Sequence, residues 1–204
     1  MVKKRSKNIL QNKITTIFII AVLLVAFTLF VIKMVNNIFP ENPRVRLETN
    51  VGNITIELYP DKAPITVDNF VGYVKSGYYD GTVFHRVIKN FMIQGGGFNE
   101  NGEEKKTGPP IKLESDNGLK NDIWTVAMAR TPTPDSATSQ FFINVKDNDF
   151  LNYAPGNQGY AVFGKVIEGT KVVKDIENSP TTTKHGMSDW PVREIKIVKA
   201  EIIS

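Results

Sequence analysis

The chain reads FHRVI over residues 84–88 and FMIQGGGF over residues 91–98. Phe84, Arg86 and Ile88 have the same parity in a strand, so the guanidinium of Arg86 points to the same side as two apolar neighbours. Arginine is rarely buried without a partner, because removing an unpaired charge from water is costly. Arg86 is therefore expected either to pair with a carboxylate or to be held in place for a ligand.

The hydrophobic pattern around this stretch predicts many short strands and few helices. Apolar or alternating runs fall at 45–47, 54–58, 82–88, 91–95, 123–129, 139–145, 160–166 and 195–202. Helical spacing predicts one helix between Pro64 and Gly77 and a second, short one around residues 172–176. Residues 99–122 are polar, which predicts a long surface loop. This pattern is typical of an all-β barrel or sandwich.

Charge is unevenly distributed along the chain. Residues 1–40 contain six basic and no acidic side chains, whereas the remainder contains 19 basic and 21 acidic ones. The body therefore lacks the excess positive charge that favours nucleic-acid binding. The absence of cysteine excludes disulfides, zinc–thiolate sites and thiol nucleophiles, and two histidines are too few for a histidine-rich metal site. We expect no nucleic-acid partner, no metal and no cofactor.

Residues 14–32 form an uncharged run of 19 residues, three of which are Thr. As a helix this run would be ~28 Å long, close to the ~30 Å hydrocarbon core of a bilayer. A cleaved signal peptide usually has a shorter apolar region and a small-residue cleavage site, which this run does not offer. We expect an uncleaved signal anchor, with a basic cytoplasmic tail (1–13), a linker (33–43) and an exported domain (44–204).

Three polar side chains occur inside apolar strand patterns, at Arg86, Gln94 and Gln140. Buried polar groups cost free energy unless they are partnered, so their joint occurrence indicates a lined pocket rather than a sealed core. Taken singly, the apolar residues near them would be assigned to the core; these are Phe91, Met92, Phe142 and Phe150.

Two other motifs offer weaker functional interpretations. The glycines at 95–97 lack the Lys-Ser/Thr of a phosphate loop, and a bulge or close backbone approach fits them better. His85 could act as a general base with Ser136 or Ser139, as in a hydrolase. Neither serine lies in a nucleophile-elbow pattern, so a structural role for His85 is favoured.

From Val45 to Ile203 the sequence resembles the cyclophilins, the cyclosporin-type peptidyl-prolyl cis/trans isomerases. Five blocks carry the likeness: YDGTVFHRVI (79–88), FMIQGG (91–96), AMAR (127–130), SQFFI (139–143) and VFGKV (162–166). The resemblance implies a closed eight-stranded antiparallel barrel capped by two α-helices, here preceded by one transmembrane helix. It also implies an external groove for a proline-containing peptide.

The resemblance assigns roles to individual residues. Arg86 falls on the catalytic arginine of the family, and Gln94 on the glutamine that supports this arginine and the substrate backbone. The proline-binding pocket falls on Phe91, Met92, Phe142 and Leu151, and the peptide groove on Ala129, Arg130 and Gln140.

Two positions depart from the better-known eukaryotic pattern. Phe150 stands where those members carry Trp, and Tyr160 where they carry His, as in bacterial members. Phe150 lacks an indole N–H donor, which argues against tight cyclosporin binding. An apolar ring at position 150 is still expected to close the pocket.

Together these features predict a membrane-anchored prolyl isomerase that acts on exported or unfolded polypeptides and assists their folding outside the cytoplasm. The alternative is a proline-peptide-binding or chaperone module in which isomerase activity is incidental.

Overall fold

The computed structural model describes residues 21, 22, 24, 25, 27, 28 and 42–203, and the chain divides into two units, Met1–Glu41 and Asn42–Ser204. The predicted basic tail lies outside the described residues, and so does most of the predicted anchor and linker. Among the residues that are described, no helix is both long enough and apolar enough to cross a membrane. The predicted site residues all lie in the second unit.

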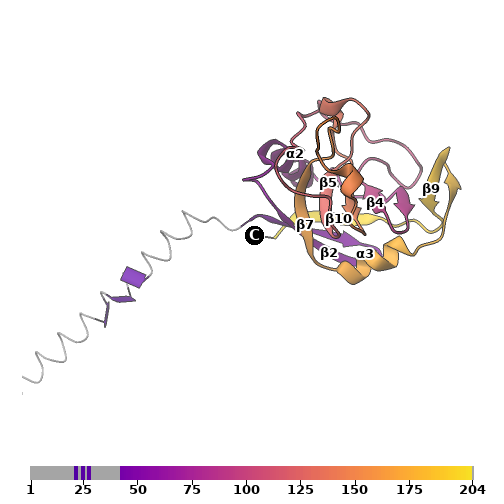
Figure 1. Ribbon diagram of the computed structural model, residues 1–204. Helices are drawn as coiled ribbons and strands as arrows, with labels where there is room; N and C mark the ends of the chain where they lie inside the picture. Colours follow the sequence, from indigo (N-terminus) through magenta and orange to yellow (C-terminus); the bar gives the residue numbers. More distant parts are fainter. Residues whose placement is uncertain (1–20, 23, 26, 29–41, 204) are drawn as a thin grey trace, which may run out of the picture. The chain divides into compact units, whose positions relative to one another are not determined.

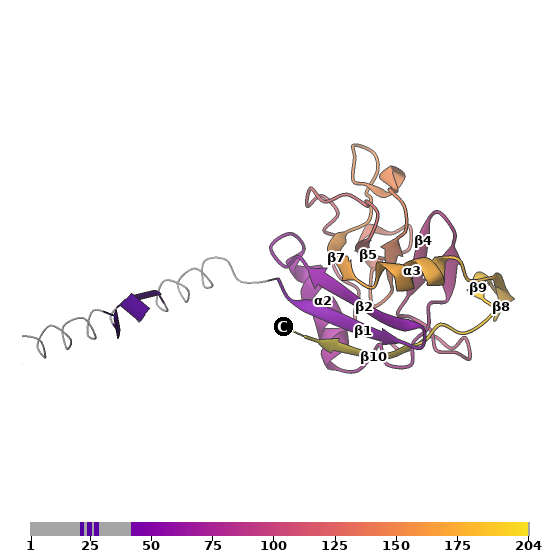
Figure 2. The same ribbon diagram turned by 90° about the horizontal axis from the view of Figure 1, so that it is seen from below.

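An antiparallel sheet forms the frame of residues 42–203 (Figure 1). In this part of the chain its eight strands are β1 (Arg44–Thr49), β2 (Gly52–Leu58), β3 (Arg86–Ile88), β4 (Met92–Gly95), β5 (Thr125–Met128), β6 (Phe141–Asn144), β7 (Val162–Glu168) and β10 (Ile197–Ile202). Their order across the sheet is β10-β1-β2-β7-β5-β6-β4-β3. Figure 2 shows β10, β1 and β2 side by side. The expectation of eight antiparallel strands is confirmed.

The expectation of a closed barrel is wrong. The sheet curls, but its edge strands β3 and β10 form no ladder with each other. Just ahead of these strands, one isolated bridge joins Val83 to Lys196, and the amide of Phe84 donates to the carbonyl of Ile195. Closure is incomplete because β3 has only three residues and also packs against β9 (Met187–Pro191), a strand of a separate hairpin.

Two α-helices of the described body pack on the sheet, as predicted. α2 (Pro64–Lys75) has proline in its first turn, where a missing N–H costs nothing, and ends before Gly77, whose φ is 65°. Its Phe70 contacts the rings of Tyr79, Phe141 and Phe163 at centroid distances between 5.0 and 5.5 Å. α3 (Thr170–Glu177) is the second helix. Two 3₁₀ turns, Pro134–Ser136 and Asp149–Leu151, lie in loops.

Alternate residues of the central strands face two different apolar clusters. Ile93, Val126, Met128, Phe141 and Ile143 belong to the main core, together with residues of β1, β2 and α2. Their sequence neighbours Met92, Ala127 and Phe142 belong to a second, smaller cluster, which also contains Leu151 and Val162. The sheet therefore has apolar side chains on both faces at this point.

A two-stranded hairpin, β8 (Thr181–Lys184) and β9, forms a small sheet of its own at one end of the domain (Figures 1 and 2). Its turn consists of His185 and Gly186, both with positive φ, which is the geometry of a tight two-residue hairpin loop. The sequence pattern did not predict this hairpin, because β8 is polar and largely exposed.

Candidate functional site

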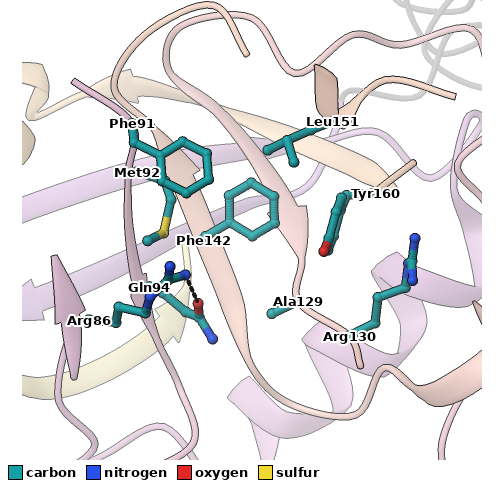
Figure 3. Close-up of a pocket in the computed structure, with 9 residues that line it drawn as sticks. All are labelled: Arg86, Phe91, Met92, Gln94, Ala129, Arg130, Phe142, Leu151 and Tyr160. Atoms are coloured by element: carbon teal, nitrogen blue, oxygen red, sulfur yellow. Dashed lines mark hydrogen bonds between the residues drawn. The ribbon is translucent and has the colours of Figure 1, made fainter. Parts of the chain in front are cut away.

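A pocket lies over the second apolar cluster, with an empty volume of about 420 Å³. The residues that line it are Arg86, Phe91, Met92, Gln94, Ala129, Arg130, Phe142, Leu151 and Tyr160. Figure 3 shows the Arg86–Gln94 pair and Arg130 on opposite sides of Phe142. The structure thus brings together nine of the residues that the sequence analysis selected.

Strand register places the polar and apolar parts of this site in one row. Arg86 of β3 is paired with Gln94 of β4, and Gln94 is paired with Phe142 of β6. Phe142 is in turn paired with Ala127 of β5. Directly paired residues point to the same face of a sheet, so these four side chains share the face that carries the pocket.

The floor of the pocket is apolar and closely packed. Met92, Phe142 and Leu151 are buried, and Phe91 and Tyr160 pack against them as partly buried residues. The ring of Tyr160 meets that of Phe142 edge-on, at a centroid distance of 5.6 Å. This floor fits a small, flat apolar ring better than a charged group.

The polar side of the pocket is a short chain of hydrogen bonds. The Nη1 group of Arg86 donates to Oε1 of Gln94 at 3.5 Å, and Nε2 of Gln94 donates to Oε1 of Gln140 at 2.9 Å. The Arg86 side chain remains 42% exposed, so its guanidinium can reach a bound molecule. Its Nε atom also lies 4.0 Å from Oδ2 of Asp189, a carboxylate that the sequence analysis did not identify. Of the two alternatives expected for Arg86, the structure shows the carboxylate partner, and the exposure of the side chain leaves room for the other, a role in holding a ligand.

Arg130 has a different environment from Arg86. Its guanidinium donates to the backbone carbonyls of Gly159, Thr131 and Pro132 and stacks over the ring of Tyr160, 4.6 Å from the centroid. These contacts tie two loops together at the rim. The Arg130 charge is thus engaged in structure, whereas that of Arg86 faces the pocket.

Buried asparagines hold the backbone of the loops that supply Phe91 and Leu151. Asn148 donates to the carbonyl of Phe91 at 2.8 Å, and Asn121 donates to the carbonyl of Leu151 at 3.1 Å. Asn144 links the two, since it donates to Asn121 and accepts from Asn148. The sequence analysis missed this network, because isolated asparagines outside a motif are usually assigned to turns.

Two predicted site residues lie beside the pocket rather than in its lining. Gln140 lines a neighbouring, more polar pocket together with Gln94, and its link to the site is the hydrogen bond with Gln94. Phe150 is 65% exposed and stacks on Phe91, with ring centroids 5.5 Å apart. Phe150 therefore supports the rim, and the expectation that its ring closes the pocket is not met.

His85 lies outside the site. It is buried against the rings of Phe98 and Trp190, and burial, reinforced by the charge of Arg86, lowers the pKa of His85 from 6.5 to about 4. The hydroxyl of Ser136 donates to Thr133, and that of Ser139 donates to Tyr78, so neither serine is paired with the histidine. This arrangement favours the structural role for His85 over the hydrolase interpretation.

In the described part of the chain, no group of three or more His, Asp or Glu side chains is placed to bind a metal ion. The pocket itself presents three kinds of group to a bound molecule. These are one exposed guanidinium, one supporting amide and an apolar floor.

Comparison with known proteins places the chain in a family. A family model for cyclophilin type peptidyl-prolyl cis-trans isomerases matches residues 44–202. A peptidyl-prolyl cis-trans isomerase of Acinetobacter baylyi is 58% identical over 163 residues, which cover 80% of this chain and 87% of the relative. Peptidyl-prolyl cis-trans isomerase B of Escherichia coli is 48% identical over 163 residues, which cover 78% of this chain and 99% of the relative.

A solved structure is similar over the same region. It is a cyclophilin type isomerase of Cryptosporidium parvum, crystallised in the presence of the dipeptide Ala-Pro, with a TM-score of 0.68 and 34% identity. The match covers 79% of this chain and 99% of that chain.

Proposed function

Because the chain belongs to the cyclophilin-type peptidyl-prolyl cis-trans isomerases, it is an enzyme that accelerates rotation about X-Pro bonds, and we propose that Arg86 is its catalytic residue. The observation that carries the proposal is a partly exposed arginine side chain placed beside an apolar floor in a cysteine-free chain. The test is a protease-coupled assay of proline isomerisation, in which the wild type and an Arg86→Ala variant are compared.

The reaction requires a site that prefers a twisted amide. A peptide bond resists rotation because nitrogen shares its lone pair with the carbonyl, which gives a barrier of ~18–20 kcal/mol. At proline the two isomers differ by only about 0.5–1 kcal/mol, yet they exchange over tens to hundreds of seconds. Catalysis therefore needs no nucleophile, only contacts that are stronger at the midpoint of rotation than in either planar form.

A guanidinium can make such a contact. In the twisted state the imide nitrogen becomes pyramidal and recovers its lone pair, which can then accept an N–H from Arg86. The planar ground state offers no comparable acceptor, so the hydrogen bond stabilises the transition state selectively. Arginine suits this role better than lysine, because its planar group is always charged and less strongly hydrated.

The apolar floor would hold the proline ring while the bond rotates. We assign the ring to Met92, Phe142 and Leu151, and the peptide on either side of it to the rim formed by Ala129 and Arg130. The solved relative crystallised with Ala-Pro supports a proline-containing ligand for this pocket. Phe150 offers no hydrogen-bond donor from its ring, and tight cyclosporin binding is not expected.

Replacing Gln94 by alanine should lower kcat/KM for an X-Pro peptide by about fivefold. The change removes a hydrogen-bond acceptor from Arg86 and a donor to Gln140, and one such bond contributes about 1 kcal/mol. The measurement is the coupled isomerisation assay. Gln158→Ala, a matched change outside the pocket, should leave the rate unchanged. If the two variants isomerise the peptide at equal rates, Gln94 does not support catalysis.

We also infer that residues 14–32 anchor the enzyme and that its clients are exported or unfolded chains. The support is the uncharged run with basic residues on its N-terminal side, followed by a family match that begins at residue 44. N-terminal sequencing of the protein from a membrane fraction should recover residues 1–13 intact. Recovery of a soluble form that begins near Asn36 would contradict the anchor.

A further inference from the structure

A carboxylate from outside the main sheet lies next to the proposed catalytic arginine. Oδ2 of Asp189 is 4.0 Å from Nε of Arg86, and the side chain of Asp189 is 39% exposed. Asp189 belongs to β9, which packs against β3, the strand that carries Arg86. We propose that Asp189 is a positioning residue, which holds the guanidinium of Arg86 in its productive orientation. This inference rests on the proposed role of Arg86.

The hairpin that carries Asp189 is anchored firmly enough for such a role. A two-stranded hairpin is marginally stable in water and needs packing against other elements. Trp190 provides this packing, since it is fully buried and contacts the rings of His85 and Phe98. The indole N–H of Trp190 also donates to Glu194 at 3.0 Å. The residue next to Asp189 is thus fixed to the domain.

The backbone of Asp189 is also unusual. Its φ is 61°, in the left-handed region that residues other than Gly, Asn and Asp rarely adopt. This conformation lets Trp190 turn into the core while the carboxylate of Asp189 stays beside Arg86 at the surface. Aspartate therefore suits this position twice, because it tolerates the positive φ and its carboxylate pairs with the charge of Arg86.

Asp189 and Gln94 contact different nitrogens of the same guanidinium. Gln94 accepts from Nη1, and Asp189 lies near Nε, so the two acceptors together restrict rotation of the planar group. With Gln94 alone, the guanidinium could turn about a single contact. At 4.0 Å the contact with Asp189 is an ion pair rather than a short hydrogen bond, and a half-exposed pair of this kind gives a modest effect.

Asp189→Asn should lower kcat roughly two- to fivefold and leave KM nearly unchanged, because positioning acts on the transition state. The ratio of wild-type to variant rates should approach one at high salt, since salt screens the ion pair of the wild type. Asp189→Gly, which tolerates a φ of 61°, should show the same loss. Asp61→Asn, which removes one charge from an exposed turn, should behave as the wild type.

Combining variants separates this inference from the role of Arg86. In an Arg86→Ala background, Asp189→Asn should cause no further loss, because the group that Asp189 orients is absent. If Arg86→Ala is slow but Asp189→Asn matches the wild type at low salt, Asp189 is not a positioning residue. A faster Asp189→Asn enzyme would also overturn the proposal, since the carboxylate would then be withholding Arg86 from substrate. If Arg86→Ala is as fast as the wild type, the proposed function itself fails.

Discussion

Replacing Arg86 by alanine is expected to lower kcat/KM for an X-Pro peptide by roughly 10- to 150-fold. This range follows from the ~1.5–3 kcal/mol that a hydrogen bond to a charged group contributes. The Arg86 side chain lines the pocket and is 42% exposed. Its carboxylate partner among the described residues, Asp189, lies 4.0 Å away, too far for a short hydrogen bond that would compete with substrate. The apolar floor remains in this variant, so part of the catalysis should persist.

Two further variants sharpen this prediction. Arg86→Lys keeps the charge but loses the planar fork, and its rate should fall between those of the wild type and Arg86→Ala. Arg193→Ala removes an exposed arginine from outside the pocket and should isomerise the peptide at the wild-type rate. If Arg86→Ala matches the Arg193→Ala control, Arg86 is not catalytic.

Acidification from pH 6.5 to pH 4 is expected to reduce the free energy of unfolding by about 3 kcal/mol through His85 alone. Burial lowers the pKa of His85 to about 4 in the folded protein, from 6.5. Between these two pH values the unfolded chain binds a proton that the folded protein does not. Stability must therefore decrease as the pH falls through this window, and must be insensitive to His85 above it.

Urea unfolding at pH 7 and at pH 4.5 can measure this contribution. Carboxylates also titrate in this range, so the wild type must be compared with a variant such as His85→Leu, which removes the titrating ring. The variant should lose less stability between the two pH values than the wild type, whatever its stability at pH 7. Equal losses in the two proteins would show that His85 is not held neutral by the fold.

The strands and the row of site residues were predictable because both depend on a short-range pattern. A period of two puts Arg86 on the face of Ile88, and the alternation in β4 and β6 puts Gln94 and Phe142 on that same face, which the pocket occupies. The expectation that Phe84 shares this face is wrong, because Phe84 lies ahead of β3 and belongs to the main core. The polar side chains that interrupt these apolar strands, Arg86, Gln94 and Gln140, then indicated a pocket. The roles of individual residues came from the resemblance, whereas the pattern alone indicated a lined pocket near Arg86, Gln94 and Gln140.

Other features depend on contacts between distant segments, which local patterns do not encode. Asp189 reaches Arg86 only because a polar hairpin far along the chain is anchored by Trp190. The incomplete barrel depends on how much of β3 is occupied by β9. The outward position of Phe150 depends on its loop, since an aromatic residue in a sequence does not reveal whether it faces a pocket or solvent.

The two apolar clusters lie on opposite faces of the central strands, so the residues that form the main core differ from those that form the floor of the pocket. Ile93, Phe141 and Ile143 face the main core, while their neighbours Met92 and Phe142 form the floor on which a ligand would rest. Substitutions on the floor therefore act on a cluster that is separate from the main core. Such a division would allow related proteins to keep the same main core while their ligand preference diverges. The floor is therefore the part of the domain to vary when a different ligand preference is wanted.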